Sequence, residues 1–212
     1  MGGSRGTGEQ GPGSGVRGAI LAGGAASRFD GGAKGLALVD GRRILDRLVR
    51  VFEVGLGALP LLVANAPDAQ AWYPGLRVVP DARPGCGALG GLYTAIIESP
   101  APVVCVAWDM PFVPPSLLRA LVETLPGHDA VLPESDGPLG MEPLCAAYGP
   151  GCQIAIERCL NTEDLRATAF HADIRLGLLP ANTVKLFGDP AHMFFNVNTP
   201  ADLTVANQLR RT

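Results

Sequence analysis

The feature that most constrains this chain is an alternation, from Val16 onward, of short apolar runs with amphipathic stretches. The apolar runs have the length of strands, and the amphipathic stretches have the spacing of helices with one buried face. This pattern is typical of an α/β fold, and we expect a three-layer sandwich with a mostly parallel mixed sheet. In the first amphipathic stretch an apolar stripe begins at Ile44 and ends at Phe52, and Gly55 can close the helix in a left-handed conformation.

The remaining elements follow from the same reasoning. Strands are predicted at residues 16–21, 36–39, 61–64, 76–79, 103–107, 130–132, 144–148 and 183–187. Helical segments are predicted near residues 44–55, 69–72, 85–98, 115–125, 152–160 and 165–171. In residues 194–198 apolar and polar side chains alternate, which predicts a strand, and Thr199 can then cap a helix that starts with Pro200.

The length of 212 residues corresponds to one large domain or two small ones, at roughly 150 residues per domain. Residues 1–15 contain no apolar side chain after Met1, so burial cannot compensate for the entropy of ordering them. We therefore predict a disordered tail over 1–15 and a single domain over 16–212.

Charge and cysteine content exclude several classes of function. The net charge is −3, so no general positive field attracts nucleic acid or a membrane surface. The five cysteines include no CxxC pair, which argues against a disulfide framework and a zinc site, and there is no GxSxG elbow. No apolar run approaches the roughly 20 residues of a membrane helix, and no signal peptide is recognisable. The sequence predicts a soluble, cytoplasmic protein.

Three glycine-rich segments match or approach phosphate-binding patterns: residues 6–11, 21–24 and 85–90. The first has no strand before it, and residues 81–84 separate the third from its strand, so neither fits the tight turn of a dinucleotide fold. Leu21-Ala22-Gly23-Gly24 directly follows the first predicted strand. Glycines at this position let backbone N–H groups approach phosphate oxygens.

Two cations, Arg28 and Lys34, follow this loop and could neutralise a polyphosphate. Lys34 stands between Ala33 and Gly35, whereas a Walker loop needs Gly before its Lys and Ser or Thr after it. P-loop hydrolysis is therefore disfavoured. When the glycine loop is considered alone, a surface loop with solvated charges remains an alternative to a phosphate-binding loop.

Asp109 follows the apolar strand at 103–107, and Asp81 follows the strand at 76–79. In open α/β sheets, ligands gather beyond the carboxyl ends of the strands, where both aspartates and the loop at 21–24 would fall. Mg²⁺ prefers hard oxygen ligands, so Asp109 is a candidate metal ligand. Capping of a turn or helix is the alternative, and it carries more weight for Asp81 than for Asp109.

From about Arg17 to Leu209, the chain resembles the molybdenum cofactor guanylyltransferases, within the wider group of GT-A-like nucleotidyltransferases. The segments that carry the resemblance are Leu21-Ala22-Gly23-Gly24 with Arg28 and Lys34-Gly35, Asp81 before Leu89-Gly90-Gly91, Trp108-Asp109-Met110-Pro111-Phe112, and Asn196-Val197-Asn198-Thr199-Pro200. The last of these is the most specific to the family. Two positions depart from the family pattern: Ala33 stands where Asp is common, and Ala88 replaces the usual Pro.

The resemblance implies a Rossmann-like GT-A-type nucleotidyltransferase fold and a Mg²⁺-dependent reaction. GMP would be transferred from GTP to the terminal phosphate of molybdopterin, with or without molybdenum, and pyrophosphate would be lost. It implies these roles: nucleotide binding by Leu21, Ala22, Gly23, Gly24, Asn65 and Asp81; catalysis by Arg28, Lys34 and Asp109, with Mg²⁺ on Asp109; and pterin binding by Asn196 and Asn198. For Asn65, a turn-forming role is the alternative. Transient contact with proteins that insert molybdenum or accept the cofactor is also implied.

Two other functions stay open. The same fold could transfer a different nucleotide to another acceptor, such as CMP to molybdopterin or a nucleotide to a sugar phosphate. A protein of another class could bind a nucleotide through the loop without turnover, although Asp109 argues against this. A dehydrogenase based on the pattern at 85–90 is a distant third.

Overall fold

The computed structural model describes residues 15–23 and 33–209. The predicted tail therefore lies outside the described residues except for Gly15, and Gly24 and Arg28 lie outside them as well. The strands are β1 Arg17–Leu21, β2 Leu38–Val39, β3 Arg42–Arg43, β4 Leu61–Val63, β5 Val78–Val79, β6 Val103–Ala107, β7 Ala130–Pro133, β8 Cys145–Tyr148 and β9 Leu176–Leu179. The α-helices are α1 Ile44–Leu56, α2 Gly87–Ile97, α3 Pro115–Thr124, α4 Cys152–Asn161, α5 Ala181–Val184, α6 Pro190–Met193 and α7 Pro200–Leu209.

Seven strands form one mixed sheet in the order β5-β4-β1-β6-β8-β7-β9. The pairs β5–β4, β4–β1, β1–β6 and β7–β9 are parallel, and β8 runs antiparallel to both of its neighbours. Strands β2 and β3 form a separate antiparallel pair joined by Asp40 and Gly41, which both have positive φ. The predicted α/β class and mostly parallel mixed sheet are confirmed.

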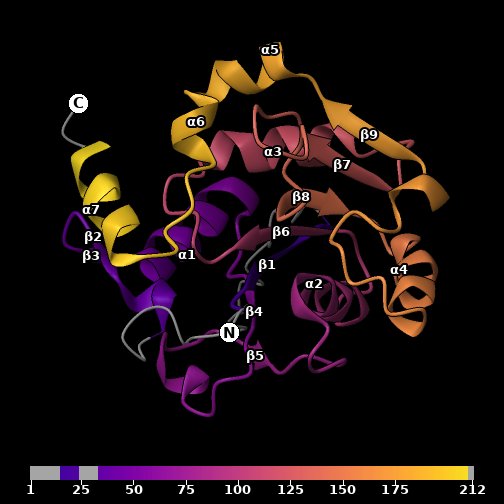
Figure 1. The fold of residues 1–212 in the computed structure, drawn as a ribbon, viewed down its shortest axis with the longest axis horizontal. Coiled ribbons are helices and arrows are strands. Elements are labelled where there is room, and N and C mark those ends of the chain that lie inside the picture. Colours follow the sequence, from indigo (N-terminus) through magenta and orange to yellow (C-terminus); the bar gives the residue numbers. More distant parts are fainter. Residues whose placement is uncertain (1–14, 24–32, 210–212) are drawn as a thin grey trace, which may run out of the picture.

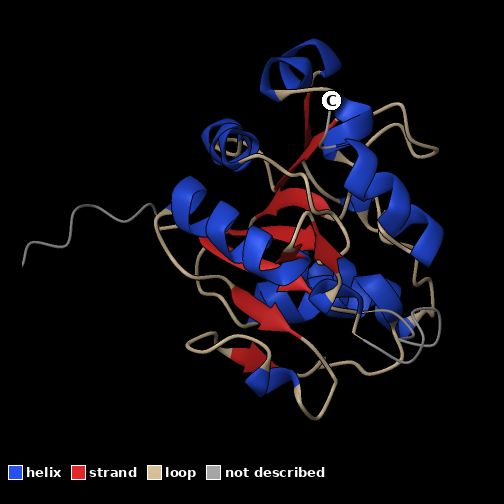
Figure 2. Ribbon diagram, turned by 90° about the vertical axis from the view of Figure 1, so that its left-hand side faces the viewer, coloured by secondary structure: helices blue, strands red, loops and turns tan. Residues whose placement is uncertain are grey.

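The sheet is the middle of three layers. Alternate residues of its strands pack into two cores: Ile20 and Val104 face one side, and Ala19 and Cys105 face the other. Helices α1 and α3 contribute to the first core, and α2 and α4 contribute to the second. Figure 1 shows the two pairs of helices on opposite sides of the sheet, and Figure 2 shows the strands enclosed between helices.

Four predictions of local structure are wrong. Helix α1 continues past Gly55 to Leu56, and Gly57 closes it with φ 76°. The helix predicted at 165–171 is a series of turns followed by a 3₁₀ turn, His171–Asp173. Residues 183–187 are helical rather than extended, and the strand is β9 upstream of Pro180. The stretch at 194–198 forms no strand, because its backbone bonds instead to the segment after β6, where Val197 N donates to Asp109 O at 2.9 Å.

Within the described part of the chain, no helix combines the length and the apolar character that crossing a membrane requires.

Candidate active site

The candidate site lies beyond the carboxyl ends of the four parallel strands β5, β4, β1 and β6. Their register places the segments after these strands along one edge of the sheet. The backbone continues this pairing past β1, since Ala22 N donates to Val63 O at 2.8 Å and Trp108 N donates to Leu21 O at 3.2 Å. The turn after β1 is thereby fixed between the turns that carry Asn65 and Asp109. Leu21 is buried, Ala22 is half-buried and Gly23 is exposed.

Lys34 connects two of the predicted site residues. Its Nζ donates to Asn198 Oδ1 at 2.8 Å and lies 4.0 Å from Asp109 Oδ2. The Lys34 and Asp109 side chains retain only 12% and 18% of their exposure, so their attraction is weakly screened by solvent. Residues from three distant parts of the chain therefore meet at one point, and two of them, Lys34 and Asp109, are the candidate phosphate-binding and metal-binding residues.

Burial dominates the electrostatics of Asp109. Loss of hydration raises the pKa of this carboxyl above its usual value, while the charge of Lys34 and a backbone hydrogen bond act in the opposite direction. A divalent cation would favour the charged carboxylate. In residues 15–23 and 33–209, no group of three or more His, Cys, Asp and Glu side chains could hold a metal. The single carboxylate of Asp109 fits Mg²⁺, which is commonly bound by one or two carboxylates together with substrate phosphates.

Asn65 and Asp81 form a second cluster at the same edge of the sheet. Asn65 Nδ2 donates to Asp81 Oδ2 at 2.7 Å, and Asp81 N donates to Asn65 Oδ1 at 2.8 Å. Next to Asp81, Ala82 N donates to Oγ1 of the buried Thr94 in α2 at 2.9 Å. A Cβ on Gly91 would lie 3.7 Å from Asp81 Oδ1, so this face of α2 is next to the carboxylate. The structure thus brings Asn65 and Asp81 together, and both predicted roles of Asn65 remain compatible with this arrangement.

The two asparagines of the C-terminal segment differ in their contacts. Asn198 bonds to Lys34, whereas Asn196 Nδ2 donates to Phe194 O at 3.1 Å. Both side chains are half-buried. Pterin binding by this pair therefore remains a prediction.

The sequence analysis missed the role of Trp108. Its indole packs against Gly35 and stacks on Trp72, with ring centroids 5.4 Å apart and an angle of 20° between the planes. Both rings are buried, and Trp108 Nε1 has no hydrogen-bond partner in the part of the chain that the structure describes. Trp108 thus supports the turn that carries Lys34. It also directly precedes Asp109, the candidate metal ligand. The pairing of a buried aromatic residue with a glycine is not visible in a sequence motif.

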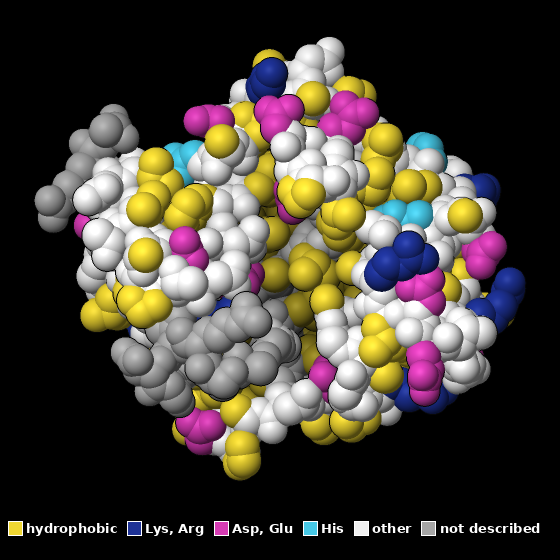
Figure 3. Space-filling model, viewed as in Figure 1, with side chains coloured by type: hydrophobic (Ala, Val, Ile, Leu, Met, Phe, Trp, Pro, Cys, Tyr) yellow, Lys and Arg dark blue, Asp and Glu magenta, His cyan; other side chains and the backbone are white. Residues whose placement is uncertain are grey.

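The face shown in Figure 3 is hollowed near its centre, with hydrophobic side chains inside and charged side chains around it. In the ribbon view the same place lies over β1 and β6, between α2 and the connection from α6 to α7 (Figure 1).

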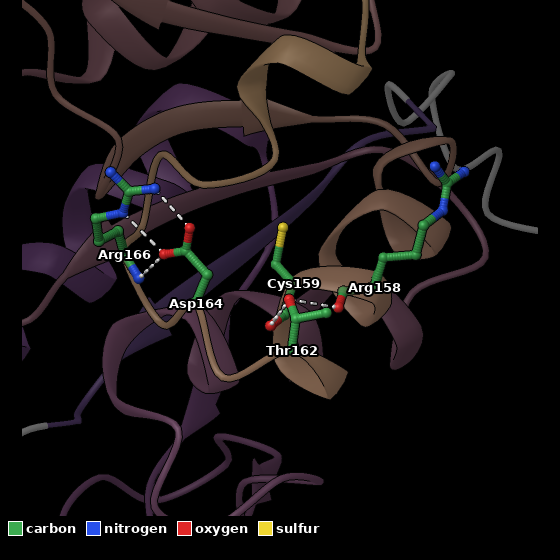
Figure 4. Close-up of polar contacts among 5 residues, drawn as sticks. All are labelled: Arg158, Cys159, Thr162, Asp164 and Arg166. Atoms are coloured by element: carbon green, nitrogen blue, oxygen red, sulfur yellow. Dashed lines mark hydrogen bonds and ion pairs between the residues drawn. The ribbon is translucent and has the colours of Figure 1, made fainter.

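A separate pocket of about 330 Å³ includes Met141, Arg166 and His171. Figure 4 shows that Arg166 is held by Asp164, with Nε–Oδ1 and Nη2–Oδ2 distances of 2.8 and 2.5 Å. Arg166 is not among the site residues that the sequence predicted, and no motif includes it.

The description of the family model that matches residues 18–174 is "MobA-like NTP transferase domain". A relative from Deinococcus radiodurans, named probable molybdenum cofactor guanylyltransferase, is 36% identical over 190 residues, covering 87% of this chain and 90% of the relative. One from Pelotomaculum thermopropionicum with the same name is 33% identical over 190 residues, covering 89% and 90%.

Among solved structures, molybdopterin-guanine dinucleotide biosynthesis protein A from Archaeoglobus fulgidus is similar in fold. Its TM-score is 0.78 at 24% identity, and the match covers 92% of this chain and 98% of that one. The fold of the whole described chain is thus that of a nucleotidyltransferase.

Proposed function

The chain belongs to the MobA-like NTP transferase family, and we propose that it is a molybdenum cofactor guanylyltransferase. Its substrates are GTP and molybdopterin, and its products are the guanine dinucleotide form of the cofactor and pyrophosphate. The names of its relatives support this reaction. The structural observation that carries the proposal is the meeting of Lys34, Asp109 and Asn198 beside the turn after β1.

In the reaction, an oxygen of the terminal phosphate of molybdopterin attacks the α-phosphorus of GTP. The bond between the α-phosphorus and the bridging oxygen to the β-phosphorus breaks, and pyrophosphate leaves with that oxygen. This transfer needs positioning and charge neutralisation, and no protein nucleophile is required. The half-buried ammonium of Lys34 supplies positive charge next to the turn where the triphosphate would lie.

Asp109 would hold Mg²⁺, which when bound neutralises phosphate charge. The carboxylate is half-buried, and Lys34 is its nearest cationic neighbour among the ion pairs of the described residues. The backbone of Leu21, Ala22 and Gly23 would face the phosphates, and the Asn65–Asp81 pair would face the base or ribose. Gly24 and Arg28 would complete the proposed nucleotide loop. Asn196 and Asn198 would face the pterin.

The reaction would take place in the cytoplasm. The enzyme would make transient contact with proteins that insert molybdenum or with molybdoenzymes that accept the cofactor.

The direct test is incubation of the protein with Mg²⁺, molybdopterin and each nucleoside triphosphate in turn, followed by mass detection of the dinucleotide and assay of pyrophosphate. The proposal predicts product with GTP and none when Mg²⁺ is chelated. The Asp109→Asn variant serves as the matched control, and its rate of product formation should fall by about 100-fold or more. Product formation with CTP but not GTP would contradict the assigned base, and nucleotide binding without pyrophosphate release would contradict an enzymatic role.

A further inference from the structure

Asn198 holds Lys34, and a carboxylate at the start of α7 holds the backbone at Asn198. We propose that Asp202 is a positioning residue that sets Lys34 for the triphosphate, acting through Asn198. This inference rests on the proposed function, because it gives Lys34 a nucleotide to bind. It makes the C-terminal helix part of the nucleotide site.

Asp202 fixes the backbone that carries Asn198. Its Oδ2 accepts from Asn198 N at 2.9 Å and from Thr199 N at 2.8 Å, while Asp202 N donates to Thr199 Oγ1 at 3.2 Å. One carboxylate oxygen therefore holds two consecutive N–H groups, in a reciprocal cap at the helix start. Burial acts to raise the pKa of Asp202, but the hydrogen bonds from Thr199 and Asn198, together with the charge of Lys34, outweigh it and hold the pKa below the usual value. The group is charged at neutral pH and accepts strong hydrogen bonds.

The side chain of Asn198 then determines where Lys34 lies. Lys34 Nζ is 2.8 Å from Asn198 Oδ1 and 4.0 Å from Asp109 Oδ2. The neutral amide therefore has the closer contact, and the ion pair is long. Without this amide, attraction would draw the ammonium toward Asp109, where it would occupy the carboxylate that we assign to the metal. Asn198 thus keeps Lys34 available for phosphate and Asp109 available for a cation.

A separate contact anchors α7, so the helix does not depend on Asp202 for its place. Asn207 Oδ1 accepts from Asp40 N at 2.8 Å, and Asn207 Nδ2 donates to Leu38 O at 3.5 Å. Ala206 is also fully buried in the core. We therefore expect Asp202→Ala to fold, with a local change in the turn at 198–199.

The test measures binding of Mg²⁺-GTP by titration to the wild type, Asp202→Ala, Lys34→Ala and the double variant. Loss of the hydrogen bonds that set a charged group should weaken binding by Asp202→Ala about ten-fold. In the Lys34→Ala background the same substitution should cause no further loss, because its effect passes through Lys34. Asp202→Asn keeps an oxygen that can accept both N–H groups and should restore most of the affinity. Thr204→Ala, an exposed change on the same helix, is the control and should bind as wild type.

An equal loss in both backgrounds would show a general structural effect and overturn the proposal, as would unchanged binding by Asp202→Ala. Failure of Asp202→Asn to restore affinity would also count against it. If Asp202→Ala does not fold, Asn198→Ala removes the middle contact and should show the same loss and the same non-additivity with Lys34→Ala. CTP is titrated in parallel: tight binding of CTP but not GTP would reject the proposed function, while the comparison of variants could still be made with CTP.

Discussion

The indole of Trp108 occupies the space that a side chain on Gly35 would need, since a Cβ at Gly35 would lie 2.4 Å from Trp108 Cε3. This contact joins the turn after the nucleotide loop to the strand end that carries Asp109. Trp108 cannot move away freely, because its other contacts include the stacked ring of Trp72. This packing contact therefore adds to the hydrogen bond from Lys34 to Asn198 in fixing the position of Lys34 relative to Asp109.

We predict that Gly35→Ala is destabilising by about 1–3 kcal/mol, because the added methyl group overpacks the contact with Trp108. Guanylyl transfer should fall as well, since the turn that carries Lys34 must shift. Thermal unfolding and the pyrophosphate assay measure the two effects. Gly15→Ala is the control, because a Cβ there meets no atom within 4 Å. Wild-type stability and activity in Gly35→Ala would show that the contact is not needed.

Asp109→Asn separates catalysis from stability. We predict a loss of Mg²⁺-dependent activity of about 100-fold or more, because the proposed metal ligand is gone. The free protein should be at least as stable as wild type at neutral pH, since burial disfavours the charge that the substitution removes. Unfolding in denaturant without nucleotide tests this second part. A strongly destabilised Asp109→Asn variant would mean that the carboxylate has mainly a structural role.

The raised pKa of Asp109 predicts how binding depends on pH. The carboxyl group of Asp109 binds its proton more tightly in the folded protein than in the unfolded chain. The protonated group therefore contributes to the free energy of unfolding at low pH, and this contribution is lost as the pH rises from 3.8 through the raised pKa. Mg²⁺ needs the charged carboxylate. Mg²⁺-dependent GTP binding should therefore fail, on acidification, at a higher pH than an exposed aspartate would produce. The thermal shift caused by Mg²⁺-GTP, recorded against pH, measures this. A midpoint at or below the ordinary aspartate value is incompatible with the prediction.

Asp129 should have the opposite dependence. Hydrogen bonds from the side chain and backbone of Arg175 lower the pKa of Asp129 to about 2. Its contribution is present above pH 3.8 and is lost as the pH falls toward about 2. Arg175 is largely exposed, so solvent screening limits the contribution. We expect Asp129→Asn to cost about 1 kcal/mol at neutral pH and nothing in strong acid.

Unfolding of the wild type and of Asp129→Asn in denaturant, at neutral pH and in strong acid, tests whether the loss of stability depends on pH. Asp164→Asn is the comparison variant, because Asp164 pairs with Arg166 only two residues away and the pair joins no strands. A loss in Asp129→Asn that does not change with pH would contradict the assignment to this ion pair.

The sequence predicted those parts of the fold in which local pattern and burial agree. The fully buried run of β6 was predicted with the observed bounds, because five consecutive apolar residues fit a strand covered on both faces. Residues 183–187 alternate like a strand but form helical turns after Pro180, with Leu186 80% exposed. Here the path of the chain after β9 decided the structure, and alternation alone could not reveal it.

The candidate site was predicted to a similar extent. The placing of Asp109 beside the turn after β1 followed from the rule that ligands gather at the carboxyl ends of strands, and Lys34 was a candidate because it follows the glycine loop. The hydrogen bond from Lys34 to Asn198 joins residues that are 164 positions apart in the sequence. A local sequence pattern cannot predict a contact between residues so far apart. The support from Trp108 also depends on tertiary packing. Motifs therefore indicated candidate residues for the site, and the fold determined which of these candidates touch.

The most direct test of the central claim is a crystal structure with GTP and Mn²⁺ in place of Mg²⁺, because the anomalous signal of manganese locates the metal. The account predicts the manganese ion bound directly to the Asp109 carboxylate, with the phosphates along Leu21, Ala22 and Gly23 and in contact with Lys34. An ion bound away from Asp109, or a triphosphate away from the turn after β1, would contradict it.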